Sequence, residues 1–143
     1  MHVLITGHTG FKGSWLTQLL KYQGHEVSGI ALDPEPDGLF ESAKLSNILK
    51  HDLRLDIRSA SELRDAVLMV KPDVVYHLAA QPLVRAGYLD PRSTFETNVI
   101  GTLNVLEAVA KCSSVKALLV VTTDKVYKNI GKQSGYLEVD ELG

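Results

Sequence analysis

The stretch Gly7-His-Thr-Gly-Phe-Lys-Gly13 carries three glycines at a three-residue spacing, directly after an apolar run at 2–6. In such a loop the first glycine permits a tight turn, the second lets the backbone approach a ligand, and the third lets the next helix pack closely on the strand. Free N–H groups at a helix start favour a pyrophosphate. A glycine turn without a ligand is the alternative, but a position between a first strand and a first helix favours a nucleotide. The predicted cradle is Gly7, Thr9, Gly10, Phe11, Lys12 and Gly13.

Two carboxylates follow the next predicted strands. Asp33 stands about 20 residues beyond Gly13, where a carboxylate accepts hydrogen bonds from both hydroxyls of an adenosine ribose. It also repels a 2′-phosphate, so the sequence favours NAD over NADP. An ordinary turn aspartate before Pro34 is the alternative. After the third strand, Asp56 is predicted to face the exocyclic amine of the adenine and Ile57 to lie against its ring.

Polar residues also stand at the ends of the fourth and fifth predicted strands. The segment at 77–81 reads HLAAQ, and the segment at 122–125 reads TTDK. Open α/β sheets bind ligands outside the carboxyl ends of their strands. Both segments are therefore predicted to lie near the glycine loop, with a plain polar turn as the alternative for the second.

Strand-like and helix-like segments alternate along the whole chain. Continuously apolar strands indicate a parallel sheet covered by helices on both faces. Right-handed crossovers then give an α/β, doubly wound, Rossmann-like fold with strand order 3-2-1-4-5 in one domain, residues 1–143. The predicted strands are 2–6, 27–32, 48–53, 73–78 and 117–122. The predicted helices are 11–23, a short one before the third strand, 59–71 and 91–112.

Periodicity assigns a buried face to each long helix. A capping box of Ser59 and Glu62 is predicted to open the second, and Asp90 with Pro91 to open the third. In the first helix the expected core residues are Trp15, Leu16, Leu19 and Leu20. In the second they are Leu63, Ala66, Val67 and Val70. In the third they are Phe95, Val99, Leu103 and Leu106.

Composition excludes several classes of protein. The 143 residues are 45% hydrophobic and carry a formal charge of −2 without a basic cluster, so no nucleic acid partner is expected. No run of about 20 apolar residues predicts a membrane span, and no signal peptide is expected before the first strand. The single cysteine, Cys112, excludes an internal disulfide and favours the cytoplasm. The five histidines lack a paired ligand spacing, so no metal site is predicted.

A family resemblance rests on segments spread along the chain. They are GHTGFKGSW (7–15), ALDP (31–34), LFE (39–41), HLAAQPLVR (77–85), TNVIGTLNVLEAV (97–109) and VVTTDKVY (120–127). Together they resemble the CDP-glucose 4,6-dehydratases, sugar-nucleotide dehydratases of the extended short-chain dehydrogenase/reductase superfamily. The glycine spacing is common to the superfamily, whereas its combination with AAQPLVR and TDK is narrower. Related dehydratases acting on other nucleotides more often carry Glu where Lys125 stands.

The resemblance implies NAD as cofactor and a nucleotide sugar, CDP-glucose, as substrate. In the family, NAD takes a hydride from C4 of the glucose, water is lost across C5 and C6, and the hydride returns to C6. By position, Thr123 is implied to hydrogen-bond the C4 oxygen and Asp124 to protonate the departing C6 hydroxyl. Lys125 stands where relatives place the C5 base. It either takes that proton with a lowered pKa or stabilises an enolate, and both roles stay open.

The resemblance also gives roles to residues after the fourth strand. Gln81 and Arg85 are implied to face the sugar nucleotide, since the forked donors of arginine suit a diphosphate. A plain surface arginine is the alternative for Arg85. Asn98 is expected to bridge backbone groups rather than touch a ligand. The residues expected beside the nicotinamide ribose are Leu78, Ala79 and Ala80.

One motif of the family does not occur in residues 1–143. This is Tyr-x-x-x-Lys, whose tyrosine removes the C4 hydroxyl proton. We therefore expect the N-terminal portion of a dehydratase, inactive alone, with a truncated sheet and homodimeric full-length relatives. A stand-alone NAD-binding module and another extended-family epimerase or dehydratase are the alternatives. The TDK triplet favours the dehydratase, because a pure binder needs no dehydration residues.

Overall fold

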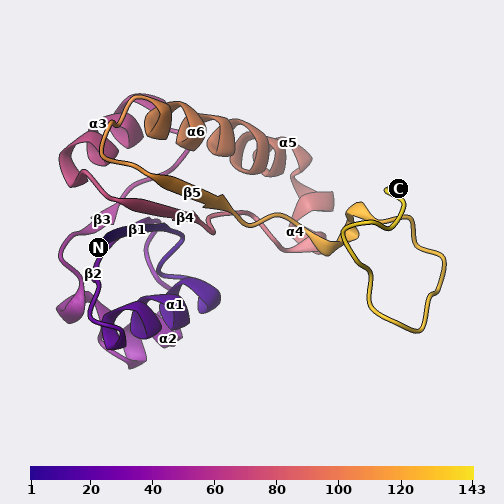
Figure 1. Cartoon of the computed structure of the whole chain (residues 1–143), viewed down its shortest axis with the longest axis horizontal. Helices are drawn as coiled ribbons and strands as arrows, with labels where there is room; N and C mark the ends of the chain where they lie inside the picture. Colours follow the sequence, from indigo (N-terminus) through magenta and orange to yellow (C-terminus); the bar gives the residue numbers. More distant parts are fainter.

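The computed structural model describes residues 1–143, except for the side chain of Asp124. Five parallel strands form one sheet in the order β3-β2-β1-β4-β5, which confirms the predicted fold class and strand order (Figure 1). The strands are β1 (His2–Thr6), β2 (Glu26–Ala31), β3 (Asp52–Arg54), β4 (Val74–His77) and β5 (Ala117–Val120). β3 is shorter than predicted and begins later, because residue 48 ends a 3-10 turn and residues 49–51 are irregular.

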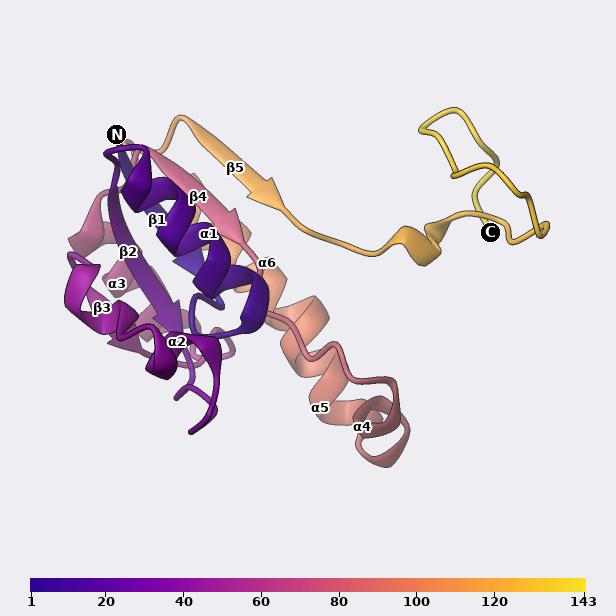
Figure 2. The same ribbon diagram turned by 90° about the horizontal axis from the view of Figure 1, so that it is seen from below.

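Helices cover both faces of the sheet, as Figure 1 shows. One face carries α1 (Phe11–Tyr22) and α2 (Leu39–Ser42), followed by η1 (Leu45–Ile48). The other face carries α3 (Ala60–Val70) and α6 (Thr102–Ala110), while α5 (Pro91–Phe95), joined to α6 by the π-helical turn η2 (Glu96–Gly101), projects away from the sheet (Figure 2). The short α4 (Val84–Leu89) precedes α5, and η3 (Asp124–Val126) follows β5. No helix among the described residues has both the length and the apolar character that crossing a bilayer requires.

The central strand β1 determines where a site can form. All five of its residues are buried, and it pairs with β2 on one side and β4 on the other. At its carboxyl end, Thr6 lies in register with Ile30 of β2 and His77 of β4. The glycine loop that follows Thr6 is thus flanked by the ends of both neighbouring strands.

The face under α3 and α6 holds the larger core cluster. Leu63, Ala66, Val67 and Val70 are buried as predicted. They pack with Leu4, Ile30 and Val75 of the sheet and with Val105 and Ala108 of α6. Burial of each large aliphatic side chain contributes about 1.5–3 kcal/mol. The predicted capping box is wrong, since Ser59 has a ψ of 82° and its side chain makes no capping hydrogen bond.

The predicted buried face of α1 is partly wrong. Leu20 is buried, but Trp15 and Leu19 are exposed. The side of α1 that meets the sheet consists mainly of Gly13, Ser14 and Thr17. Small residues are required there because the helix lies very close to the preceding loop.

The predicted buried face of the third long helix is wrong as well. Phe95, Val99, Leu103 and Leu106 are all exposed. The buried residues are instead Gly101, Asn104, Val105 and Ala108. The start of the helix agrees with prediction, since the Asp90 carboxylate accepts a hydrogen bond from the Ser93 N–H at 3.0 Å and Pro91 follows it.

β5 is an edge strand, with partly exposed side chains. Beyond it the chain leaves the sheet and runs to the C-terminus apart from the rest of the molecule (Figure 2). Within that segment, the rings of Tyr127 and Tyr136 stack at 5.3 Å and Tyr127 pairs with Leu142.

Candidate functional site: a cleft at the carboxyl ends of the strands

A cleft of about 740 Å³ opens at the carboxyl ends of β1, β2 and β4. Its walls come from the glycine loop, from the residues after β2, β3 and β4, and from the helices that follow. Eleven of the sequence-predicted residues line it: Gly7, Thr9, Gly10, Phe11, Lys12, Gly13, Asp56, Ile57, Leu78, Ala79 and Ala80. Gln81 lines it as well.

The glycine loop leaves no room for side chains at two of its three glycines. Gly7 has a φ of +76°, and a Cβ there would lie 2.8 Å from the Ala79 nitrogen. A Cβ on Gly13 would lie 2.2 Å from the Gly7 carbonyl oxygen. A Cβ on Gly10 would have the Gly7 carbonyl oxygen, at 3.4 Å, as its nearest neighbour. This position therefore has room for a ligand to approach the backbone.

The start of α1 is chemically suited to an anion. Gly10 is its N-cap, no side chain caps the helix, and the first turn contains no acidic residue. The positive end of the helix dipole is therefore not compensated by the protein. Together with the room at Gly10, this fits the diphosphate of a dinucleotide.

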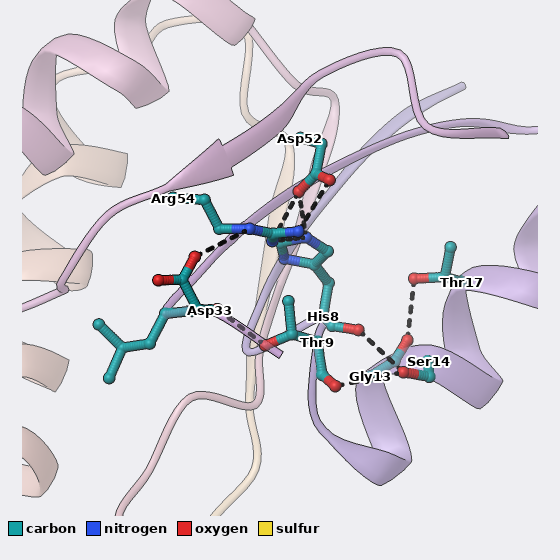
Figure 3. A network of polar contacts seen from close by, with 9 residues as sticks. His8, Thr9, Gly13, Ser14, Thr17, Asp33, Asp52 and Arg54 are labelled. Atoms are coloured by element: carbon teal, nitrogen blue, oxygen red, sulfur yellow. Dashed lines mark hydrogen bonds and ion pairs between the residues drawn. The ribbon is translucent and has the colours of Figure 1, made fainter. Parts of the chain in front are cut away.

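Behind the loop lies a polar network that connects it to β3 (Figure 3). His8 is fully buried, and its Nε2 lies 2.8 Å from an Asp52 carboxylate oxygen. Arg54 Nη1 lies 3.2 Å from the same ring nitrogen. Burial lowers the pKa of His8, although the bond to Asp52 opposes the shift. Among the described residues, His8 Nδ1 is the one buried side-chain polar atom without a hydrogen-bond partner.

Asp33 lies at the end of β2 beside this network. Its side chain is 89% exposed, and one carboxylate oxygen is 3.6 Å from Arg54 Nε. The Thr9 hydroxyl donates to the Leu32 carbonyl at 3.1 Å, which fastens the glycine loop to the same strand end (Figure 3). Ala31 and Leu32 line the cleft, whereas Asp33, the next residue along the chain, is not among the lining residues.

The residues that follow β3 form another part of the cleft wall. Asp56 accepts from the backbone N–H and the guanidinium of Arg58, at 2.6–2.9 Å. These bonds lower the pKa of the Asp56 carboxyl. Ile57 is buried against Gly101, where a Cβ would come within 2.6 Å of its side chain. The Asp56 carboxylate, which was predicted to face an adenine amine, is thus hydrogen-bonded to Arg58.

Two side-chain bridges hold the loop after β4. Buried His77 bonds Thr6 through Nδ1 at 2.6 Å and Thr102 through Nε2 at 2.9 Å. The Asn98 side chain accepts from the Gln81 N–H at 2.8 Å and donates to the Gln81 carbonyl at 3.0 Å. The prediction that Asn98 bridges backbone groups is confirmed. Asn98 lies within the π-helical turn η2, and such turns are frequent at functional sites.

Replacing Asn98 by alanine is expected to lower the free energy of unfolding by about 1–3 kcal/mol, because both backbone groups of Gln81 lose their partner. Urea unfolding followed by circular dichroism measures the change. The matched control is Asn47→Ala on η1, where the asparagine is exposed and the expected change is within about 0.5 kcal/mol. Equal effects of the two substitutions would contradict a bridging role.

The pH dependence of stability follows from the histidines. Burial lowers the pKa of His2, His8 and His77 below 6.5 in the folded chain. Below pH 6.5 the unfolded chain binds protons that the folded chain does not. Stability is therefore full above pH 6.5 and falls as the pH decreases, by about 1.4 kcal/mol per pH unit for each proton taken up. Urea titrations between pH 7.5 and 5.5 test this, in a range where Asp73, with a pKa of about 2, stays ionised.

His8→Asn is the diagnostic variant for this profile. Because one of the buried histidines is gone, its stability should fall less steeply with decreasing pH than that of the native chain. A flat native profile, or equal slopes for the two proteins, would show that burial of His8 does not govern the titration.

The residues with implied catalytic roles lie beyond the cleft lining. The lining reaches Val121 and Thr122 after β5. Thr123 and Lys125 follow on an exposed 3-10 turn, where the Thr123 hydroxyl accepts from the Lys125 N–H at 3.1 Å. The side chain of Asp124, the implied acid, lies outside the described part of the chain. Arg85 is exposed on α4 and does not line the cleft, although Leu83 and Ala86 on either side of it do.

Sequence reasoning missed several lining residues. Arg58 is the one with an available signal, since it stands two positions after Asp56 at a strand end. The others are Ala31, Leu32, Leu55, Pro82, Leu83, Ala86, Ser93, Thr97, Val121 and Thr122. The described residues contain no cluster of three or more histidine, cysteine or carboxylate side chains suited to a metal ion.

The sheet order, the glycine loop and the cleft define a dinucleotide-binding protein of the doubly wound class. The chain belongs to the NAD dependent epimerase/dehydratase family, which it matches over residues 3–142. NAD is thus the cofactor of its family. Among curated proteins, the chain is similar to CDP-glucose 4,6-dehydratase of Salmonella typhimurium. The two are 44% identical over 99% of this chain and 39% of that protein.

A second curated relative is a dehydratase named for another sugar nucleotide. GDP-mannose 4,6-dehydratase of Vibrio cholerae is 35% identical over 74% of this chain and 30% of its own length. The chain thus spans less than half the length of these curated relatives.

Solved structures agree with the family assignment. Pal from Bacillus thuringiensis has a TM-score of 0.86 at 31% identity, over 100% of this chain and 45% of that one. UDP-glucose 4-epimerase of Thermus thermophilus, solved as a complex with NAD, has a TM-score of 0.81 at 30% identity, over 100% of this chain and 44% of its own.

Proposed function

We propose that this chain is the NAD-binding, N-terminal part of a sugar-nucleotide 4,6-dehydratase that acts on CDP-glucose in the cytoplasm. The observation that carries the binding function is the contact of the glycine loop with the β4 end, where a Cβ on Gly7 would lie 2.8 Å from the Ala79 nitrogen. The 44% identity with a CDP-glucose 4,6-dehydratase supports the choice of reaction and substrate.

In this proposal the chain's own residues bind and orient the cofactor. The first turn of α1 donates N–H groups to the diphosphate, and Asp33 accepts from the ribose hydroxyls. Ala79 and Ala80 leave room beside the nicotinamide ribose. When bound, NAD supplies a hydride acceptor and donor.

The segment after β5 supplies the groups for dehydration. The Thr123 hydroxyl hydrogen-bonds the C4 oxygen of the sugar, and the Asp124 carboxyl protonates the departing C6 oxygen. Lys125 either removes the C5 proton or stabilises the resulting enolate. Gln81 and Arg85 face the sugar nucleotide. Gln81 follows β4 and the segment 123–125 follows β5, at the edge of the sheet where open α/β folds bind ligands.

Cofactor binding is tested by thermal melting of the chain with NAD⁺ and with NADP⁺. NAD⁺ is expected to raise the melting temperature more than NADP⁺, because the Asp33 carboxylate repels a 2′-phosphate. Equal shifts would contradict the role of Asp33. No shift with either nucleotide would contradict the binding function itself.

The dehydratase assignment is tested at the level of the gene and of the product. The coding DNA beyond codon 143 is expected to continue into Tyr-x-x-x-Lys, whereas a stop codon there would favour a stand-alone NAD-binding module. Residues 1–143 contain no such motif, so CDP-glucose and NAD⁺ should give no 4-keto product, which is detected by its absorbance in alkali. Product formation would show that another residue replaces the tyrosine.

A further inference from the structure

Arg54 is the last residue of β3 and lies beside Asp33, just outside the cleft lining. Its two terminal nitrogens contact the two carboxylate oxygens of Asp52, NH1 at 2.7 Å and NH2 at 3.0 Å. Its guanidinium carbon lies 5.1 Å from the centre of the Phe40 ring, and Phe40 is itself buried against His8. A guanidinium fixed by a paired carboxylate and an aromatic face has little freedom to turn away.

The Nε–H side of Arg54 faces Asp33, while Nη1 also lies 3.2 Å from His8 Nε2. Nε lies 3.6 Å from an Asp33 oxygen, which is longer than a hydrogen bond, and Asp33 is otherwise exposed (Figure 3). Among the contacts of the described residues, Asp33 is the side chain that lies beside this edge of the guanidinium.

The negative charges around Arg54 outnumber its own positive charge. With His8 neutral, Asp33 and Asp52 contribute two negative charges and Arg54 one positive charge. A 2′-phosphate would meet a net negative corner, whereas a ribose hydroxyl would meet a carboxylate acceptor. Loss of the Asp33 charge leaves a neutral pair with a free guanidinium edge, and such an edge suits a phosphate.

We propose that Arg54 determines specificity at the 2′ position of the cofactor ribose. In the native chain its positive charge lies beside Asp33, the hydroxyl acceptor, and without the Asp33 charge it becomes a ligand for a 2′-phosphate. The choice between NAD and NADP then depends on one carboxylate in front of a preformed phosphate site. This inference rests on the proposed function, because it takes the adenosine ribose to bind at Asp33.

The test uses ADP and 2′,5′-ADP as probes of the ribose corner, and NAD⁺ and NADP⁺ as whole ligands, with dissociation constants from calorimetry. Native chain should bind NAD⁺ and ADP at least about 10-fold more tightly than their 2′-phosphorylated forms. Asp33→Asn should bind NADP⁺ and 2′,5′-ADP at least about 10-fold more tightly than the native chain does. Asp33→Asn/Arg54→Gln should lose this gain and keep the NAD⁺ affinity of Asp33→Asn.

Two further variants make the result specific to Arg54. Asp33→Asn/Arg54→Lys keeps the positive charge but loses the forked donors of the guanidinium. It should retain only part of the gain in affinity for 2′-phosphorylated ligands. Asp33→Asn/Arg64→Gln removes an exposed arginine of α3 that pairs with Asp65, and should retain all of it. Circular dichroism melting establishes that each variant is folded.

The outcomes separate the two proposals. If Asp33→Asn gains no affinity for 2′-phosphorylated ligands, or if the Arg54→Gln double variant keeps the gain, the role of Arg54 is wrong while NAD⁺ binding stands. If no folded variant and no native chain binds any of the four nucleotides, the proposed function fails and the inference fails with it.

Discussion

Replacement of Gly13 by alanine is expected to abolish NAD⁺ binding and to lower stability markedly. A Cβ at this position would lie 2.2 Å from the Gly7 carbonyl oxygen and 2.6 Å from the His8 Cα. Both are backbone atoms, so no side-chain rotation relieves the clash and α1 must move away from the loop. Overpacking of this kind costs about 1–3 kcal/mol, and the displaced helix start no longer faces the diphosphate. Calorimetry with NAD⁺ and urea unfolding measure the two effects.

The control for Gly13→Ala is Gly135→Ala, where a Cβ would meet no atom within 4 Å. That variant should bind NAD⁺ as the native chain does. Native affinity in Gly13→Ala would mean that the close approach of α1 to the loop is not required for the site.

Replacement of Gly29 by alanine is the second substitution with a large expected effect. A Cβ on Gly29 would lie 2.2–2.4 Å from three atoms of the His8 ring. The ring is buried and bonded to Asp52, so it cannot simply swing aside. We expect a loss of about 1–3 kcal/mol in the free energy of unfolding.

Shortening His8 should relieve that clash. The double variant Gly29→Ala/His8→Ala is expected to be more stable than the sum of the single effects predicts, with a coupling of about 0.5–3 kcal/mol. Urea unfolding of the four proteins gives the coupling directly. Strict additivity would show that the added methyl group does not act through the His8 ring.

The sheet could be predicted from the sequence because its signals are local. The run at 2–6 is apolar throughout and is buried throughout, as a central parallel strand requires. The glycine spacing fixed the first strand, loop and helix as one unit, and right-handed crossovers then left one order for the remaining strands. Strand ends were less predictable, as the late start of β3 shows.

The buried faces of two helices could not be predicted, because hydrophobicity does not reveal how closely a helix approaches its neighbour. Trp15 and Phe95 are large and apolar, yet both are exposed. Gly13 and Gly101 occupy the contacts instead, since the available space admits only small residues there. A face chosen by residue size as well as by hydrophobicity would have been nearer to the structure.

The candidate site was predictable to the extent that it follows strand ends. The glycine loop and Ala79 come from segments far apart in sequence, and the parallel sheet brings them together. The network of His8, Asp52 and Arg54 was not predicted, because no spacing rule joins a loop residue to a neighbouring strand. The roles of Asp33, Arg85, Thr123 and Lys125 stay predictions, since none of them is among the lining residues of the cleft. The role of Asp124 stays a prediction as well, because its side chain lies outside the described part of the chain.

The placement of β1 between β2 and β4 has a consequence for the order of events during synthesis. The wall of the cleft opposite the glycine loop is fixed by the bond from the Ala79 N–H to the Thr6 hydroxyl, which joins residues 73 positions apart. Ribosomes add about 5–20 residues per second, so Ala79 is made roughly 4–15 s after Thr6. During that interval the nascent chain contains the glycine loop but not the β4 residues that form the opposite wall of the cleft. Cofactor capture on the ribosome must therefore wait for β4.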